Sequence, residues 1–255
     1  HRRRVSGNSQ KTKRELNMSR PVTTLFLIQS LDGKITTGDV DELDVDKDFK
    51  RISGIKEGLQ QYYELERQTD PFSLNTGRVM AKIGVNERTE EPEKIGCSFV
   101  IIDSKTHLTS EGTEYMAKWV KRLFLVTNNP NHPAFKLKRK YENIEIVYYK
   151  SEINLSDLLQ KLKDEHGIER LTIQSGGTLN ASWVRQSLID YVSIVIAPCL
   201  IGGKDTQSLV GGESLHNQTD LLKIRSLKLI KVEKLKNSYI HLVYKMDKKV
   251  SIEKS

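Results

Sequence analysis

The stretch Leu171-Thr-Ile-Gln-Ser-Gly-Gly-Thr-Leu-Asn180 is the most informative part of this sequence. A β-rich apolar run leads into two glycines, which open a segment of helical character. Because glycine lacks a Cβ, a ligand can approach the backbone there, and the free amides of a helix N-terminus attract phosphate oxygens. The stretch therefore predicts a strand, a phosphate-binding turn and a helix, or alternatively a tight turn without a ligand. It matches neither GxGxxG nor the P-loop pattern, so the standard Rossmann fingerprint and an NTPase are not supported.

Two further segments place polar groups after predicted strands. In Asn75-Thr-Gly-Arg-Val-Met-Ala81, a glycine again lies at a helix start. Arg78 is a fixed cation there that suits a phosphate, although a surface ion pair fits the pattern equally well. In Ile101-Ile-Asp-Ser-Lys-Thr106, Ser104 and Lys105 either hold an additional phosphate or begin a solvated loop.

The first predicted strand breaks at a turn signal, Asp32-Gly33, within Gln29-Ser-Leu-Asp-Gly-Lys-Ile35. Ser30 and Asp32 are candidates for lining a pocket, but Asp32 is also typical of a turn residue that bonds its own backbone. Each of these four segments is a weak signal alone. Together they place phosphate-binding groups at the carboxyl ends of several strands of one sheet, as a dinucleotide site requires.

Short apolar runs alternate with helical periods over the first two-thirds of the chain, which predicts an α/β fold with a mostly parallel sheet covered by helices. The predicted strands are Val22–Gln29, Phe72–Asn75, Ser98–Ile102, Leu123–Val126, Asn143–Tyr149, Leu171–Gln174 and Val192–Ala197. The predicted helices are Asp46–Gln68, Glu111–Val120, a segment N-capped by Ser156, and Gly177–Ser187. Two late strand candidates, Ser226–Val232 and Ser238–Met246, have no helix between them, so we expect them to pair antiparallel at one edge.

Composition excludes several classes of protein. The chain has 255 residues, of which 37% are apolar and 29% charged, so it is neither a disordered tail nor a fibre. The longest strongly apolar stretch, Tyr191–Ile201, is interrupted by Pro198 and is too short to span a bilayer. Cys97 and Cys199 lack CxxC spacing, which fits a reducing cytoplasm and predicts no metal site. We expect Cys199, directly after Pro198, to be a buried and inert thiol.

The net charge of +8 lies at the ends of the chain. Residues 1–17 carry a net +5 and residues 223–255 a net +7, which leaves −4 for residues 18–222. A mildly acidic body argues against a groove for a nucleic-acid backbone. We interpret residues 1–17 as a leader that is non-native or flexible, or else a basic arm, residues 18–246 as a single domain, and residues 247–255 as a solvated tail.

In combination, these segments resemble the RibD C-terminal reductase domain family, which is part of the dihydrofolate-reductase-like superfamily. The resemblance covers roughly residues 21–244. It is carried by Ser30-Leu-Asp-Gly-Lys-Ile, Thr76-Gly-Arg, Ile102-Asp-Ser, Gln174-Ser-Gly-Gly-Thr-Leu-Asn, Leu188-Ile-Asp-Tyr and Ile196-Ala-Pro-Cys-Leu-Ile-Gly-Gly203. It implies a mixed, mostly parallel central sheet with flanking helices, and a homodimer formed through the sheet edge.

The resemblance also implies NADPH as cofactor and hydride transfer to a small pyrimidine, pterin or related substrate. The best-known reaction of the family reduces the ribosyl ring of 5-amino-6-(5-phosphoribosylamino)uracil to a ribityl chain. By position, the residues implied to bind NADPH are Thr76, Gly77, Arg78, Val79, Ser104, Lys105, Gly176, Gly177, Thr178, Leu179 and Asn180. Those implied to border the substrate are Ser30, Asp32, Gly33, Arg67 and Gln174.

The sequence departs from the family in its substrate half. An acidic residue usual after the second glycine segment is missing in Val79-Met-Ala-Lys-Ile83, and Gln174 stands where a glutamate is common. Asp32 or an ordered water is then the remaining candidate for the proton donor, and Lys82 either pairs with a substrate phosphate or is a solvated lysine. No zinc-deaminase signature occurs, so we expect reductase activity alone. The missing acid also motivates a second hypothesis, a nucleotide-binding module that has lost catalysis.

Overall fold

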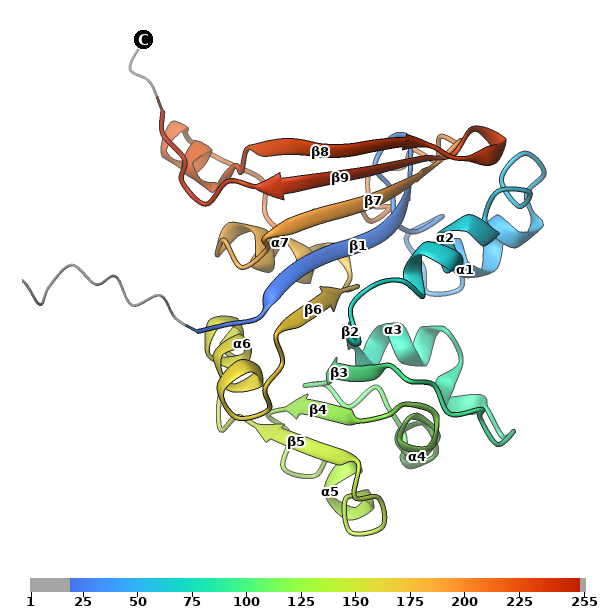
Figure 1. The fold of residues 1–255 in the computed structure, drawn as a ribbon, viewed down its shortest axis with the longest axis vertical. Coiled ribbons are helices and arrows are strands. Elements are labelled where there is room, and N and C mark those ends of the chain that lie inside the picture. Colours follow the sequence, from blue (N-terminus) through green and yellow to red (C-terminus); the bar gives the residue numbers. More distant parts are fainter. Residues whose placement is uncertain (1–18, 253–255) are drawn as a thin grey trace, which may run out of the picture.

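The computed structural model describes residues 19–252, and Figure 1 shows their fold. The predictions for residues 1–17 and for the last residues of the tail lie outside this range. Nine strands form one sheet in the order β5-β4-β3-β2-β6-β1-β7-β9-β8. The strands are β1 (Val22–Ser30), β2 (Phe72–Thr76), β3 (Ser98–Ile102), β4 (Leu123–Thr127), β5 (Ile144–Tyr148), β6 (Arg170–Ile173), β7 (Tyr191–Ala197), β8 (Leu227–Lys234) and β9 (Ile240–Met246).

Strand direction follows the prediction from the sequence. Strands β1 to β7 pair in parallel, whereas β9 runs antiparallel to both β7 and β8. The mostly parallel sheet with an antiparallel C-terminal edge is therefore confirmed. Because β6 returns between β2 and β1, the loops that leave these three strands meet at one edge of the sheet, which is where open α/β sheets bind ligands.

Helices cover both faces of the sheet. The α-helices are α1 (Val45–Asp48), α2 (Gln60–Glu66), α3 (Gly77–Lys82), α4 (Ser110–Trp119), α5 (Ala134–Leu137), α6 (Leu155–Asp164) and α7 (Gly177–Arg185). Short 3-10 helices span Phe49–Arg51, Val85–Glu87, Gln218–Lys223 and Lys236–Ser238. None of the helices within residues 19–252 has the length and apolarity needed to cross a membrane.

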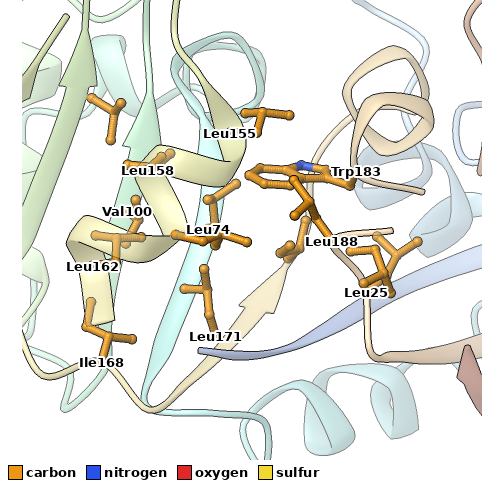
Figure 2. Close-up of a cluster of buried hydrophobic side chains, with 14 of the residues drawn as sticks. Leu25, Leu74, Val100, Leu155, Leu158, Leu162, Ile168, Leu171, Trp183 and Leu188 are labelled. Atoms are coloured by element: carbon orange, nitrogen blue, oxygen red, sulfur yellow. The ribbon is translucent and has the colours of Figure 1, made fainter. Parts of the chain in front are cut away.

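Alternation along the strands divides the core between the two faces. Leu25 packs in the cluster beneath α6 and α7, whereas its neighbour Phe26 packs with residues of the α1–α2 region. Figure 2 shows the first cluster, to which Leu158 of α6, Leu74 of β2 and the fully buried Trp183 of α7 all belong. Burial of this kind contributes roughly 1.5–3 kcal/mol per large apolar side chain.

Two sequence-based predictions about helices are wrong. The single helix predicted over Asp46–Gln68 is divided into α1, a 3-10 turn, a run of turns and α2. Gly54 interrupts it with a left-handed φ of +86°, a conformation that ends a helix and that glycine adopts readily. Helix α6 is capped by Asn154, whose side chain accepts a hydrogen bond from the Asp157 amide, rather than by Ser156.

Cys199 is less buried than the sequence suggested. Cys199 is half-buried rather than buried, and Cys97 is likewise half-buried. Burial raises the pKa of both thiols, that of Cys97 to about 11. Both therefore carry the neutral, unreactive form at ordinary pH. The described part of the tail, residues 247–252, holds no helix or strand.

Candidate active site

Two adjoining hollows lie at the edge of the sheet where β1, β2 and β6 end. The glycine-loop hollow, of about 350 Å³, lies between the starts of α3 and α7 and includes the Gly176 turn. The aromatic hollow, of about 520 Å³, extends from there beneath α2 toward Phe99 and Trp119. The residues that line both hollows are Leu27, Asp46, Tyr62, Val79 and Gln174. The two hollows therefore form one continuous cleft with a shared junction.

The two glycines before α7 have different surroundings. Gly176 is the N-cap of α7 and lines the glycine-loop hollow, and a Cβ there would meet only Gln207 Oε1, at 3.4 Å. At Gly177, a Cβ would lie 2.3 Å from the carbonyl oxygen of Ser208. Gly176 is thus open to a ligand, whereas Gly177 lets the loop after β7 pack against the helix.

Three more residues of α7 were predicted to bind the cofactor. Thr178 and Leu179 line the glycine-loop hollow. Asn180 is fully buried instead: its Oδ1 accepts from Ser175 Oγ at 2.6 Å, and its Nδ2 donates to Leu209 O at 2.8 Å. The structure therefore puts Asn180 in a structural role behind the loop, and Gly177 shares that role.

The start of α3 forms the opposite wall of the same hollow. Thr76 caps the helix by accepting from the Val79 amide at 3.2 Å, and both residues line the hollow. Arg78 also lines it and pairs with Asp41 at 2.9 Å, with both side chains 57% exposed. Such a solvated pair contributes little, so Arg78 can exchange Asp41 for a ligand anion. Gly77 does not reach the hollow, because it packs closely against the Asp103 carboxyl group.

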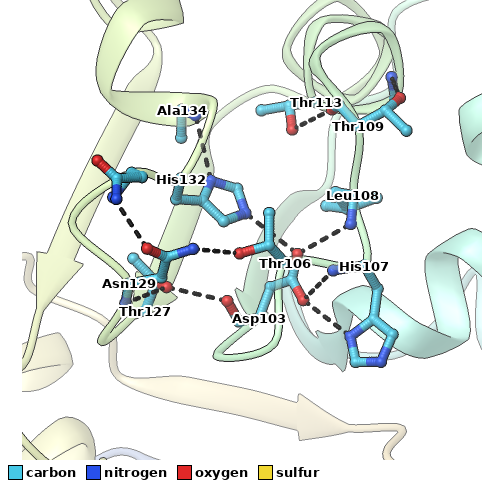
Figure 3. A network of polar contacts seen from close by, with 12 residues as sticks. Asp103, Thr106, His107, Leu108, Thr109, Thr113, Thr127, Asn129, His132 and Ala134 are labelled. Atoms are coloured by element: carbon cyan, nitrogen blue, oxygen red, sulfur yellow. Dashed lines mark hydrogen bonds and ion pairs between the residues drawn. The ribbon is translucent and has the colours of Figure 1, made fainter.

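Asp103 organises the third loop, after β3 (Figure 3). Its carboxylate accepts from the amides of His107 at 2.9 Å and Leu108 at 3.0 Å, and it contacts His132 Nε2 at 3.1 Å. Burial alone would raise the pKa of Asp103, but the hydrogen bonds from His132 and from these two amides outweigh it and hold the pKa below its ordinary value. Asp103 is therefore a buried carboxylate that fixes the loop between it and Leu108.

This loop brings Lys105 and His107 to the glycine-loop hollow. Lys105 is exposed and has no ion-pair partner within residues 19–252. Ser104, predicted beside it, does not line either hollow. His107 was missed by sequence reasoning, because nothing in Lys105-Thr-His indicates which side chain turns toward a ligand.

The loop after β1 reaches the glycine-loop hollow through Ile35 and Thr36, but the residues predicted at its start do not. Neither Ser30, Asp32 nor Gly33 lines either hollow. Asp32 accepts from Ser30 Oγ at 2.5 Å and from the amides of Ile201 and Gly202 at 3.1 and 2.6 Å. The Ser30 hydroxyl and these amides lower the pKa of Asp32 to about 2. An ionised carboxylate that ties two loops together is poorly suited to donating a proton, so this arrangement does not favour Asp32 in that role.

The aromatic hollow contains both remaining substrate candidates. Arg67 is exposed on its rim, and Gln174 lies at the junction. Gln174 Nε2 donates to Glu66 Oε1 at 2.6 Å, and its Oε1 accepts from Ser73 Oγ at 2.8 Å. These two contacts fix which end of the amide faces which neighbour. Lys47 and Lys50 add positive charge to the same hollow.

Two carboxyl groups in the cleft were missed by sequence reasoning. Burial is the main cause that raises the pKa of both Asp46 and Glu66, and the Coulomb effect of Asp44 raises that of Asp46 further. Both lie in the segment that was expected to form one long helix, where acidic residues are usually solvated. The sequence pattern did not identify these two residues as site residues. Their positions depend on the break at Gly54, which separates α1 from α2.

Comparison with known proteins agrees with this architecture. A model of the RibD C-terminal domain matches residues 21–241. A relative from Methanothermobacter thermautotrophicus is 27% identical over 208 residues, covering 80% of this chain and 90% of the relative. One from Archaeoglobus fulgidus is 28% identical over 220 residues, covering 82% and 94%. Both relatives are named 2,5-diamino-6-ribosylamino-4(3H)-pyrimidinone 5′-phosphate reductase.

Solved structures share the fold. RibD of Acinetobacter baumannii superposes with a TM-score of 0.63 at 17% identity, over 90% of this chain and 58% of that one. The riboflavin biosynthesis reductase Rib7 of Saccharomyces cerevisiae gives a TM-score of 0.57 at 16% identity, over 95% and 93%. The chain thus spans just over half the length of that RibD chain and nearly all of Rib7. By the match over residues 21–241, the chain belongs to the RibD C-terminal domain family.

Proposed function

We propose that this protein is an NADPH-dependent reductase that acts on a phosphorylated ribosylaminopyrimidine, as its named relatives do. One observation carries the proposal: groups suited to phosphate converge on the glycine-loop hollow from three separate loops. These are the Gly176 turn, Arg78 at the start of α3 and Lys105 after β3. A second hollow adjoins the first, so a cofactor and a substrate have room to meet at the shared junction.

The residues of the glycine-loop hollow fit NADPH. The N-cap of α7 has no side chain to satisfy the amides of the first turn, so these amides are available to the pyrophosphate. Arg78 is suited to the same phosphates, and Lys105 to the 2′-phosphate. When bound, NADPH supplies the hydride, while the protein supplies orientation and electrostatics.

The aromatic hollow fits the substrate. Tyr62 stacks on Phe26 with ring centroids 5.3 Å apart, which keeps its ring fixed at the junction. Arg67, Lys47 and Lys50 give the hollow the charge that a substrate phosphate needs. Gln174, held by Glu66 and Ser73, offers a fixed amide to a pyrimidine ring.

Titration with NADPH and NADH tests the cofactor assignment. We expect the wild-type protein to bind NADPH more tightly, and Lys105→Ala to lower that preference about tenfold, because one charge-assisted phosphate contact is lost. Lys121→Ala removes an exposed lysine away from both hollows and is the matched control. An unchanged preference in Lys105→Ala would show that Lys105 does not contact the 2′-phosphate. Binding of NADPH without oxidation would favour a nucleotide-binding module.

The C-terminal edge of the sheet supports a homodimer. Leu227, Leu229 and Val232 of β8 are 43%, 50% and 63% exposed. Their partners in β9 are Met246, Tyr244 and Leu242, so these side chains share one face of the sheet. An apolar face on an edge strand is typical of a surface that pairs with a second copy. Cys97 and Cys199, both free, fit a cytoplasmic enzyme.

Charge on this face should separate the two copies. We expect Leu229→Lys with Val232→Lys to convert a dimer to a monomer in light scattering, since a two-fold interface buries each substituted side chain twice. Lys228→Glu, also on β8, is the control that should leave the dimer intact. A wild-type protein that remains monomeric at high concentration would contradict the proposal.

A further inference from the structure

Asp46 occupies the point at which the two hollows meet. Five residues line both hollows, and among them Asp46 is the only carboxyl group. A group that must act on a substrate carbon beside the cofactor has to lie at this junction. The family's usual acid is absent from the Val79–Ile83 segment, so the reaction needs another source of a proton.

Helix α1 and its neighbours hold Asp46 in place. Its amide donates to Asp44 Oδ1 at 2.9 Å, and Asp44 in turn pairs with Lys82 at 3.0 Å. Tyr63 of α2 donates its hydroxyl to Asp46 Oδ1 at 3.0 Å. Within residues 19–252, no hydrogen bond reaches Asp46 Oδ2. One oxygen is therefore fixed by the protein and the other is available to a ligand.

Three other candidates for the proton donor are already engaged or misplaced. Glu66 lines the aromatic hollow but not the glycine-loop hollow, so it does not lie at the junction; like Asp46, it has one oxygen engaged, here by the Gln174 amide. Lys82 is committed to Asp44, with both side chains only 12% exposed. Asp32 lies outside both hollows. Asp46 is thus the acid whose position and free oxygen agree with the task.

We propose that Asp46 donates the proton that accompanies hydride transfer, and that Tyr63 is its positioning residue. The inference rests on the proposed reductase function. In the open-chain form of a ribosylamino substrate, the C=N carbon gains hydride and the nitrogen takes the proton from Asp46. The substrate is reduced to an amine, bound NADPH is oxidised to NADP⁺, and the Asp46 carboxylate is reprotonated by solvent.

The electrostatic surroundings of Asp46 are consistent with this role. Burial raises its pKa most, and the charge of Asp44 raises it further, while the Tyr63 hydrogen bond and the charges of Lys50 and Lys82 act in the opposite direction. The net effect is a raised pKa, as a donor needs. The remaining titratable groups that face it are Tyr62 and Glu66 of α2.

The sign of the pH dependence follows from the direction of proton transfer. A general acid works only when protonated, so the turnover number should fall as the pH rises through the pKa of Asp46. Tyr63 stabilises the ionised form, so Tyr63→Phe should raise the pKa of Asp46 and move this fall to higher pH. A merely structural role for Tyr63 would not move it.

The test compares variants in turnover of 2,5-diamino-6-ribosylamino-4(3H)-pyrimidinone 5′-phosphate with NADPH. Asp46→Asn should lower the turnover number about 100-fold and leave NADPH affinity unchanged. The turnover number of this variant should no longer decrease at high pH. The turnover number of Glu66→Gln should still decrease at high pH. Glu42 is an exposed acid outside both hollows, so Glu42→Gln should match the wild type. The inference would be overturned if the turnover number of Glu66→Gln no longer decreased at high pH, or if that of Asp46→Asn still did.

A measurement without cofactor or substrate separates this inference from the proposed function. Carbon NMR of the unliganded protein, labelled at aspartate carboxyl groups, should give Asp46 a pKa above its ordinary value of 3.8, and Tyr63→Phe should raise it further. A pKa at or below the ordinary value, or one insensitive to Tyr63, would overturn the inference while the reductase function stands. A wild-type protein that never oxidises NADPH would overturn both.

Discussion

Valine in place of Gly176 is expected to weaken NADPH binding about 10- to 100-fold with nearly wild-type stability. The backbone there has φ −73° and ψ 162°, which any residue adopts. The new Cβ would meet only Gln207 within 4 Å, and Gly176 lines the glycine-loop hollow, so we expect the valine side chain to enter this hollow and keep a phosphate from the amides of α7. Loss of one or more charge-assisted hydrogen bonds at about 1.5–3 kcal/mol each gives this factor. Fluorescence titration, together with thermal unfolding, measures both quantities.

Gly177→Val is the matched comparison, one residue further along the chain. Its Cβ would collide with the Ser208 carbonyl, and a backbone neighbour cannot yield as a flexible side chain does. We therefore expect Gly177→Val to lower stability by about 1–3 kcal/mol, with NADPH affinity reduced only through the disturbed loop. If Gly177→Val left stability unchanged, or Gly176→Val bound NADPH normally, the division of roles between the two glycines would be wrong.

Asp103→Ala should cost about 2–5 kcal/mol of unfolding free energy. The substitution leaves the buried donors at His132 and Leu108 without their acceptor, and each such group costs about 1–3 kcal/mol. The loop that carries Lys105 and His107 should lose its fixed position at the same time. Urea denaturation measures the stability, and Glu91→Gln, which removes an exposed partner of Lys118, should change it by less than about 0.5 kcal/mol.

The Asp103 network also predicts a pH dependence. The folded protein holds the pKa of Asp103 below 3.8, so folding favours the ionised form. Its contribution to stability is complete above that pH and is lost as the pH falls through the folded-state pKa. Asp103→Asn should reduce this acid-side loss. An acid denaturation profile identical to that of the wild type would show that Asp103 is not the group responsible.

Local patterns were sufficient to predict the strands of the sheet and their directions. Continuous apolar runs such as Ser98–Ile102 are typical of strands buried on both faces, and the structure gives β3 these same bounds. The absence of a helix between the last two strands likewise predicted their antiparallel pairing. Polar residues directly after such strands had to meet at one edge, which is why Thr76, Arg78, Lys105 and Gly176 line one hollow.

What the sequence could not predict depends on contacts between distant segments. The sequence alone does not distinguish Gly176 from Gly177. Only the position of the Ser208 loop shows that Gly176 faces the hollow and that Gly177 packs against this loop. Asp32 looked like a cleft residue, but its position is decided by amides nearly 170 residues away. Asp46 stood at the start of one long predicted helix, because the turn at Gly54 that separates α1 from α2 has no strong signature in the sequence.

The central claim is that the cleft transfers hydride from NADPH to a ribosylaminopyrimidine phosphate. The most direct test incubates the protein with this pyrimidinone phosphate and NADPH deuterated at the transferred position, followed by mass analysis of the product. The account predicts NADPH oxidation with deuterium on the new ribityl carbon, and about 100-fold slower transfer in Asp46→Asn. NADPH that binds but is never oxidised, with no deuterium in the pyrimidine, would contradict it.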